Sequence, residues 1–284
     1  MPKFFIPEIK LGKHRLGRHI NHDPRSLRFV VPPAKVDKSV VWPRHIPILD
    51  QGNLGSCTGN AETGALGCDP FWPTFDAATQ ASLNEKMAVK IYSLATTIDP
   101  YQGQYPPTDT GSDGLSASKA AKQLNFISGY VWATSLAEAM TLIQNGPFIA
   151  GTDWTTNMDK PNSEGIIKDP AGGQVRGGHE YVCRERDADK GLWWFDNSWG
   201  GTWGKSGRFA YDDAGLTALL GRGGDLTSSV PLTSPPPVPI PGDPDLVTWW
   251  TATKPWATGR TFVAGSKGGV ASKACIDLAA KKGL

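Results

Sequence analysis

The sequence predicts an α+β fold in which helices come first and strands follow. Small residues from Ser56 to Gly67 and apolar residues at helical spacing between Asn84 and Thr97 predict two of the helices. Ser116 to Leu124 and Leu136 to Asn145 predict two more, and Gly146-Pro147 ends the last. Strand-like runs begin at Phe148, so we expect the second half of the chain to be rich in β-structure.

Composition limits the function classes. The chain has 284 residues, enough for one large or two modest domains. Its net charge of +2 argues against a nucleic-acid partner held by a broad basic field. The absence of a long apolar run predicts no membrane span, and the N-terminus does not resemble a signal peptide.

Residues 1–40 read as an extended basic arm that prolines interrupt. Its basic residues are Lys10, Lys13, Arg15, Arg18, Arg25 and Arg28, with His14, His19 and His22 among them. The charge predicts either a contact with an acidic surface of a partner chain or a solvated tail. No helix is evident to align the histidines, and no cysteine spacing fits zinc, so we expect no metal site.

One stretch, from Gln51 to Ala61, places Cys57 after two glycines and a serine and before a helical run. A thiol at a helix N-terminus has a lowered pKa, and the thiolate is the nucleophilic form. This position therefore suits a catalytic cysteine, although a buried structural cysteine would fit the stretch alone.

A second block begins with Gly177-Gly178-His179-Glu180, and a third reads Asn197-Ser198-Trp199-Gly200-Gly201-Thr202-Trp203-Gly204 with Gly207 after it. With the Cys57 stretch, these blocks resemble the papain-like cysteine peptidases over residues 40 to 225. The resemblance implies a papain-like fold of a helical and a β-barrel-like half with a cleft between them. It implies no cofactor.

The resemblance also implies a role for each matching residue. Cys57 would be the nucleophile, His179 the general base and acid, and Asn197 the residue that orients the imidazole. Gln51 would donate its side-chain amide to the oxyanion. Trp199 would shield the His179–Asn197 hydrogen bond from water. The thiol and imidazole would rest as an ion pair.

Six residues are expected to bind the substrate, and Trp199 is one of them. In the family, a glycine-bearing loop pairs with the substrate as a short antiparallel strand, and Gly111, Ser112 and Gly114 match that loop. An ordinary helix cap at Ser112 or Asp113 is compatible with this role. Gly178 and Glu180 flank His179, and we hypothesise that Glu180 selects a basic residue in the second position on the acyl side of the scissile bond. The alternative is a solvated or salt-bridged carboxylate.

The chain also departs from the family. Leu54 stands where secreted eukaryotic members usually have a disulfide cysteine, which is compatible with a bacterial or phage protein. Cys57 and Cys68 are placed poorly for a bridge, and Cys183 reads as a core residue. Papain-like precursors carry a longer helical propeptide that fills the cleft. The arm is short and lacks helical periodicity, so we do not expect inhibition of that kind.

After the peptidase-like domain, assigned to residues 41–225, a proline-rich linker is assigned to residues 226–244 and a small segment with Trp249, Trp250 and Trp256 to residues 245–284. The tryptophans predict docking, and we favour a protein over a carbohydrate surface. The sequence therefore predicts a cysteine endopeptidase that acts on peptide or protein substrates, carried in a phage particle through contacts of the arm and the C-terminal segment with other chains. The alternative is a structural or binding protein of a virion, in its tail or capsid, on the same scaffold.

Overall fold

The computed structural model describes residues 9–11, 14–24, 26, 31 and 37–232. The C-terminal segment at residues 245–284, Cys275 and most of the predicted linker lie outside the described residues. So do Lys13, Arg25 and Arg28 of the arm.

One half of the described chain is helical. It contains α1 (Cys57–Leu66), α2 (Ala77–Ser82), α3 (Glu85–Ile98), α4 (Gly114–Gln123) and a 3-10 turn at Trp72–Thr74. The side chains of Asp76, Asn84 and Asp113 cap α2, α3 and α4 by accepting a backbone N–H of the first turn. Every residue of α1 is buried, because the other helices cover one side of it and the sheet covers the other. This encloses the residue that begins α1, Cys57.

The other half is an antiparallel sheet. Its strands are β3 (Val40–Val41), β4 (Ile127–Ala133), β5 (Phe148–Thr155), β6 (Val175–Asp187), β7 (Leu192–Asp196), β8 (Arg208–Asp212) and β9 (Asp225–Pro231). The order is β4-β9-β5-β6-β7-β8, with β3 paired to β6. Helices α5 (Leu136–Asn145) and α6 (Asp213–Leu220) pack against the sheet around an aromatic core that contains Trp154, Trp193 and Phe209. A 3-10 turn, Thr156–Met158, follows β5.

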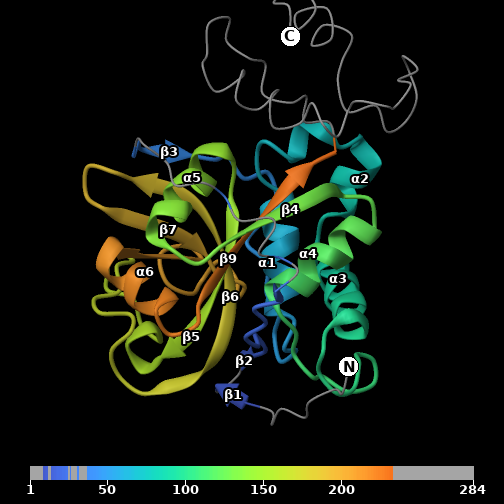
Figure 1. The fold of residues 1–284 in the computed structure, drawn as a ribbon, viewed down its shortest axis with the longest axis horizontal. Helices are drawn as coiled ribbons and strands as arrows, with labels where there is room; N and C mark the ends of the chain where they lie inside the picture. The colour runs from blue at the N-terminus through green and yellow to red at the C-terminus, as the bar shows by residue number, and fades with distance from the viewer. Residues whose placement is uncertain (1–8, 12–13, 25, 27–30, 32–36, 233–284) are drawn as a thin grey trace, which may run out of the picture. The chain divides into compact units, whose positions relative to one another are not determined.

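The two halves meet where α1 packs against β6 and β5. Ala61 and Ala65 of α1 contact Ile149 of β5 and Val182 of β6. The small α1 side chains let the helix approach the sheet closely, so α1 lies directly beside the sheet (Figure 1).

The N-terminal arm contains a short hairpin of β1 (Ile9–Leu11) and β2 (His14–Leu16). In Figure 1, β2 lies between the helices on the right and the sheet on the left. The described residues of the predicted extended arm therefore include a short β-hairpin. At the other end, β9 forms sheet pairs at residues that the sequence assigns to the linker, because its main-chain hydrogen bonds to β4 and β5 complete the sheet.

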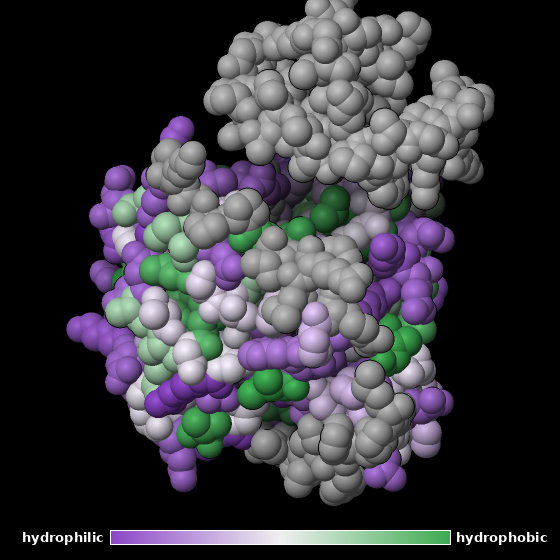
Figure 2. Space-filling view, in the orientation of Figure 1, coloured by the Kyte–Doolittle hydropathy of each residue, from purple (hydrophilic) through white to green (hydrophobic). Residues whose placement is uncertain are grey.

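The face shown in Figure 2 carries hydrophilic residues interspersed with small apolar patches, as on most globular domains. Within the part of the chain that the structure describes, no helix combines the length and the apolar character needed to cross a bilayer.

Candidate active site

Cys57 begins α1 and its side chain is fully buried. Burial, and after it the nearby Glu180 carboxyl, raise the pKa of the Cys57 thiol to about 12. Backbone hydrogen bonds from Glu180, Gly17 and Thr58 act in the opposite direction. Glu180 follows His179 in β6, so this contact places the Cys57 sulfur beside the part of β6 that carries His179.

His179 lies on β6, and Asn197 follows directly after the neighbouring β7. His179 Nε2 lies 2.8 Å from Asn197 Oδ1, which also accepts the Ser198 backbone N–H at 2.8 Å. Because Asn197 Oδ1 can only accept, His179 Nε2 must carry a proton. In the neutral ring this leaves Nδ1 with a free lone pair, and Nδ1 is buried without a hydrogen-bond partner. The geometry is that of a positioned base.

Trp199 covers this pair. Its ring lies 4.9 Å from the His179 ring at an interplanar angle of 28°, and Trp154 contacts it edge-on. Such a cover excludes water and strengthens the enclosed hydrogen bond, which is the arrangement that shielding by Trp199 requires.

Both the oxygen and the nitrogen of the Gln51 side-chain amide make hydrogen bonds. Its Oε1 accepts the Ser198 hydroxyl at 2.6 Å, and this orients Nε2. Nε2 donates to the carbonyl oxygens of Leu54 at 2.8 Å and Arg15 at 2.9 Å. Gln51 therefore presents an N–H to a peptide carbonyl of another segment, which is what an oxyanion donor must do.

That other segment is the arm. Residues 14–24, here called the arm segment, run past the predicted substrate-binding residues. The Ser112 backbone N–H donates to Gly17 O at 2.8 Å, and the His19 N–H donates to Ser112 O at 2.7 Å. The Arg18 N–H donates to Gly178 O at 3.0 Å. We expected no inhibition of the helical-propeptide kind from this arm, yet its extended backbone pairs with the predicted substrate-binding residues, because such pairing needs no helical periodicity.

The direction of the arm segment also matters. It pairs with Ser112 in parallel, whereas the resemblance implies an antiparallel substrate. Gly111 has φ of +72°, and a Cβ there would lie 2.3 Å from Gly17 O, so a glycine is needed for this approach. Gly114 begins α4 and instead leaves room for Glu180, since a Cβ at Gly114 would lie 2.3 Å from Glu180 Oε1.

Glu180 is 1% exposed, so it is not a solvated carboxylate. Its Oε2 lies 4.0 Å from Arg18 Nε of the arm segment, and Arg18 Nη2 lies 3.0 Å from Asp225 Oδ1. Burial raises the pKa of Glu180, and the carboxyl of Asp225 adds to this, while Arg18 opposes it. The sequence did not reveal Asp225 as a residue near the site. It lies at the start of β9, outside the three stretches around Cys57, His179 and Asn197 that resemble the peptidase family.

Asp109 is a second acidic residue that the sequence did not reveal. Arg15 Nη1 lies 2.8 Å from its carboxylate, which also accepts the Gly55 backbone N–H at 2.8 Å and the Tyr92 hydroxyl. Asp109 thereby ties the arm segment to the loop that precedes Cys57. Its position two residues before Gly111, in the predicted substrate-binding loop, was the feature of the sequence that could have pointed to it.

The pKa shifts of Cys57 and His179 run against the predicted thiolate–imidazolium pair in the arm-bound state. Burial lowers the pKa of His179 to about 4, the hydrogen bond to Asn197 opposes this, and His14 lowers the pKa further. With the pKa of Cys57 raised, both shifts favour the neutral forms of the two groups. The arm segment takes part in this burial, because His14 stacks on Trp199 at 4.6 Å and Gly17 lies against Cys57.

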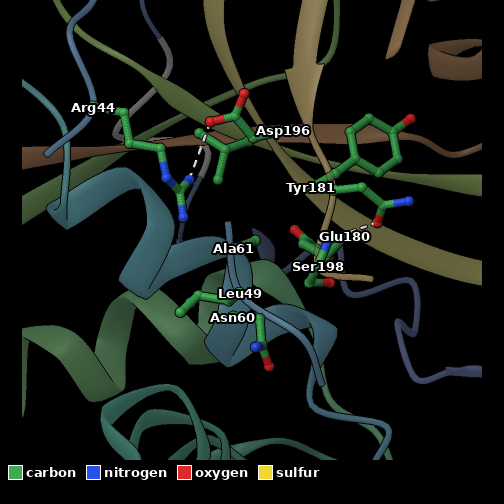
Figure 3. A pocket seen from close by; sticks show the side chains of 10 residues that line it. Arg44, Leu49, Asn60, Ala61, Glu180, Tyr181, Asp196 and Ser198 are labelled. Carbon is green, nitrogen blue, oxygen red and sulfur yellow. Dashed lines mark hydrogen bonds and ion pairs between the residues drawn. The ribbon is translucent and has the colours of Figure 1, made fainter. Parts of the chain in front are cut away.

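A small cavity of about 10 Å³ lies between α1 and β6 (Figure 3), and Asn197 is one of the residues that line it. Asn60, Ala61, Tyr181 and Ser198 line it, and the Arg44–Asp196 ion pair lies at one side. It has room for about one water molecule. It is therefore not the place where a peptide binds.

Comparison with solved structures identifies the fold. Xylellain, a cysteine protease from Xylella fastidiosa, matches with a TM-score of 0.58 and 19% identity, over 79% of this chain and 96% of that one. The proform of the ragweed cysteine protease Amb a 11 matches with a TM-score of 0.52 and 18% identity, over 88% and 76% of the two chains. Procathepsin L 3 from Tenebrio molitor matches with a TM-score of 0.50 and 18% identity, over 72% and 75%.

These neighbours confirm the predicted α+β, papain-like fold of two halves. Neither a scan against protein-family models nor a search of curated proteins finds a match to the sequence.

Proposed function

We propose that this protein is a cysteine endopeptidase in which Cys57, His179 and Asn197 hydrolyse peptide bonds, and that the arm segment holds it in an inactive state. One observation carries the proposal. Gln51 Nε2 donates to a peptide carbonyl of a segment whose Gly17 lies against Cys57, while Asn197 orients His179 in the adjoining strand. A nucleophile, a base with its orienting group and an oxyanion donor therefore converge on one peptide segment.

In the proposed reaction, His179 Nδ1 takes the thiol proton as Cys57 Sγ attacks the scissile carbonyl carbon. The carbonyl π electrons move to the oxygen, which Gln51 Nε2 and the Cys57 backbone N–H stabilise. The tetrahedral intermediate collapses, the C–N bond breaks, and the imidazolium protonates the leaving amine. Water activated by His179 then hydrolyses the acyl-enzyme and releases Cys57.

The arm segment itself escapes this reaction in the proposed scheme. It pairs with Ser112 in the direction opposite to that of a substrate, which misaligns its peptide bonds for attack. Displacing it would open the site and rehydrate Cys57.

The test is labelling by an epoxide-type cysteine-peptidase inhibitor, with the full chain and a Gly17→Val variant whose side chain cannot fit beside Gly55. We expect Gly17→Val to be labelled at Cys57 alone and to cleave peptides, and Cys57→Ala and His179→Asn in that background to do neither. Equal, slow labelling of Cys57, Cys68 and Cys183 without cleavage would contradict the proposal and favour the structural alternative.

The role in a phage particle, and the contacts with other chains through the arm and the C-terminal segment, stay predictions. The described arm residues contact the chain's own substrate-binding residues, so those contacts favour an internal role.

A further inference from the structure

The arm segment buries one long cationic side chain, Arg18, which is 4% exposed. Its Nη2 donates to Asp225 Oδ1 and to the Gly223 carbonyl, each at 3.0 Å, and its Nε lies 4.0 Å from Glu180 Oε2. Two acceptors, Asp225 Oδ1 and Gly223 O, and the Glu180 carboxyl at ion-pair distance lie around the guanidinium, and together they define what we call the Arg18 pocket.

The anions of the Arg18 pocket belong to the sheet, and its cation belongs to the arm. Asp225 and Glu180 are 2% and 1% exposed. Among the described residues, the basic side chains beside Asp225 are Arg18 at 3.0 Å and the His22 ring at 3.9 Å, both from the arm segment. Two buried carboxylates cost several kcal/mol unless a cation compensates them. When the arm segment leaves, the carboxyl groups of Asp225 and Glu180 lose the cation that compensates their burial.

Apart from Arg18, the charged groups near Glu180 in the described part of the chain do not supply a cation. Asp113 and Glu62 lie near Glu180 and add to its negative surroundings. Asp113 is bonded to Ser116 and Asn21, and Glu62 to Ser118 and Ser229, all of which are neutral donors. The Asp225 carboxylate therefore loses its Arg18 partner when the arm segment is displaced, and the described residues around Glu180 offer no cation in its place.

The shape of the pocket depends on Gly151 of β5. A Cβ there would lie 2.7 Å from Arg18 Nε, 2.7 Å from Asp225 Oδ1 and 2.8 Å from Glu180 Oε2. The missing side chain leaves the width that a guanidinium occupies. Acceptors on several sides suit its fork of donors better than a lysine ammonium.

We infer that the Arg18 pocket is the specificity pocket for an arginine side chain of the peptide substrate, with Asp225 as its main anion and Glu180 as the second. The inference rests on the proposed peptidase function and goes beyond it by naming the substrate class. The arginine would stand second on the acyl side of the scissile bond, because Ser112 and Gly178, which bind the arm backbone around Arg18, are the residues expected to bind substrate. Arg18 then occupies the pocket in place of the substrate's arginine.

The test uses the full chain in the Gly17→Val background and three fluorogenic peptides that differ at that position: arginine, its neutral isostere citrulline, and alanine. We expect kcat/KM to be higher for arginine than for citrulline by roughly 30-fold or more. Asp225→Asn should reduce this ratio at least tenfold, and Glu180→Gln should reduce it less. Gly151→Ala should lower cleavage of the arginine peptide relative to the alanine peptide.

Asp187→Asn, which changes a carboxylate of the same strand as Glu180 paired with Lys190 at the surface, is the matched control and should keep the ratio. An arginine-to-citrulline ratio below about threefold, or one that Asp225→Asn leaves intact, would overturn the inference.

A binding measurement separates this inference from the proposed function. Fluorescence anisotropy of the labelled peptides on Cys57→Ala, in the same background, reports the pocket without catalysis. Preferred binding of arginine with no cleavage by the parent would contradict the peptidase and support the pocket. Cleavage with no preference in binding or rate would support the peptidase and contradict the pocket.

Discussion

Gln51 Nε2 donates a hydrogen bond of 2.9 Å to the carbonyl oxygen of Arg15, so a side chain and an arm carbonyl from distant parts of the sequence meet beside Cys57. The Ser198 hydroxyl fixes the orientation of that amide. The donor is thus aimed before any substrate arrives, which is the condition under which such groups lower a barrier.

Replacing this donor tests its role. In the Gly17→Val background, we expect Gln51→Glu to lower kcat by about 100- to 1,000-fold, because a carboxylate of the same shape offers no N–H to the developing oxyanion. Steady-state kinetics measures this. A rise in KM with kcat preserved would show that Gln51 binds the ground state and not the transition state.

The seating of the arm segment depends on the lack of a side chain at Gly17. A Cβ there would lie 2.0 Å from Gly55 O, so we expect Gly17→Val to displace the arm segment and to raise peptidase activity by roughly tenfold or more, since the competent fraction grows. Gly129→Ala is the matched control, because a Cβ at Gly129 meets no atom within 4 Å. Equal activity of Gly17→Val and the wild type would contradict the inhibitory role.

Thiol reactivity reports the same change. The pKa of Cys57 is raised to about 12, so at pH 8 about one thiol in 10,000 is ionised. We expect alkylation of Cys57 by iodoacetamide to be slow near neutral pH and to speed up as pH rises. In Gly17→Val the pH profile should shift to lower pH, as the thiol gains water and a path to His179. Mass spectrometry of Cys57 alkylation at several pH values measures this. Identical pH profiles of the wild type and Gly17→Val would contradict the proposal that the arm segment shields Cys57.

His179 should make the arm-bound state sensitive to acid. Its folded pKa of about 4 lies below the unfolded value of 6.5, so the unfolded chain binds more protons between these values. The contribution of His179 to the unfolding free energy is therefore present above pH 6.5 and is lost as the pH falls towards 4. We expect the unfolding free energy of the wild type to drop by about 3 kcal/mol more than that of His179→Asn over this range.

Chemical denaturation at pH 7 and pH 4 measures that difference. Asp113 and Glu180, whose pKa values are raised, oppose the effect in both proteins, so the difference between them isolates His179. Parallel pH dependences in the two proteins would contradict the prediction.

The sequence predicted the helix at Glu85 from its apolar periodicity, and Asn84 caps it. Small residues predicted the helix at Cys57, and the family resemblance implied the two halves of the fold. It also selected His179 and Asn197, which the structure brings to 2.8 Å. The contacts of the arm could not be predicted in this way. Arg18 and Asp225 are 207 positions apart, and Arg15 and Asp109 are 94 apart. Only the folded sheet brings such pairs together, and neither pair carries a local pattern.

The continuity of the chain between Arg18 and Cys57 has a kinetic consequence. A segment on a short tether returns to its site at a local concentration in the millimolar range, whatever the dilution of the protein. Turning the protein on by adding substrate alone would then demand comparable amounts of peptide. A single cut between the arm and the helix would remove the tether, let the freed piece diffuse away, and make activation irreversible.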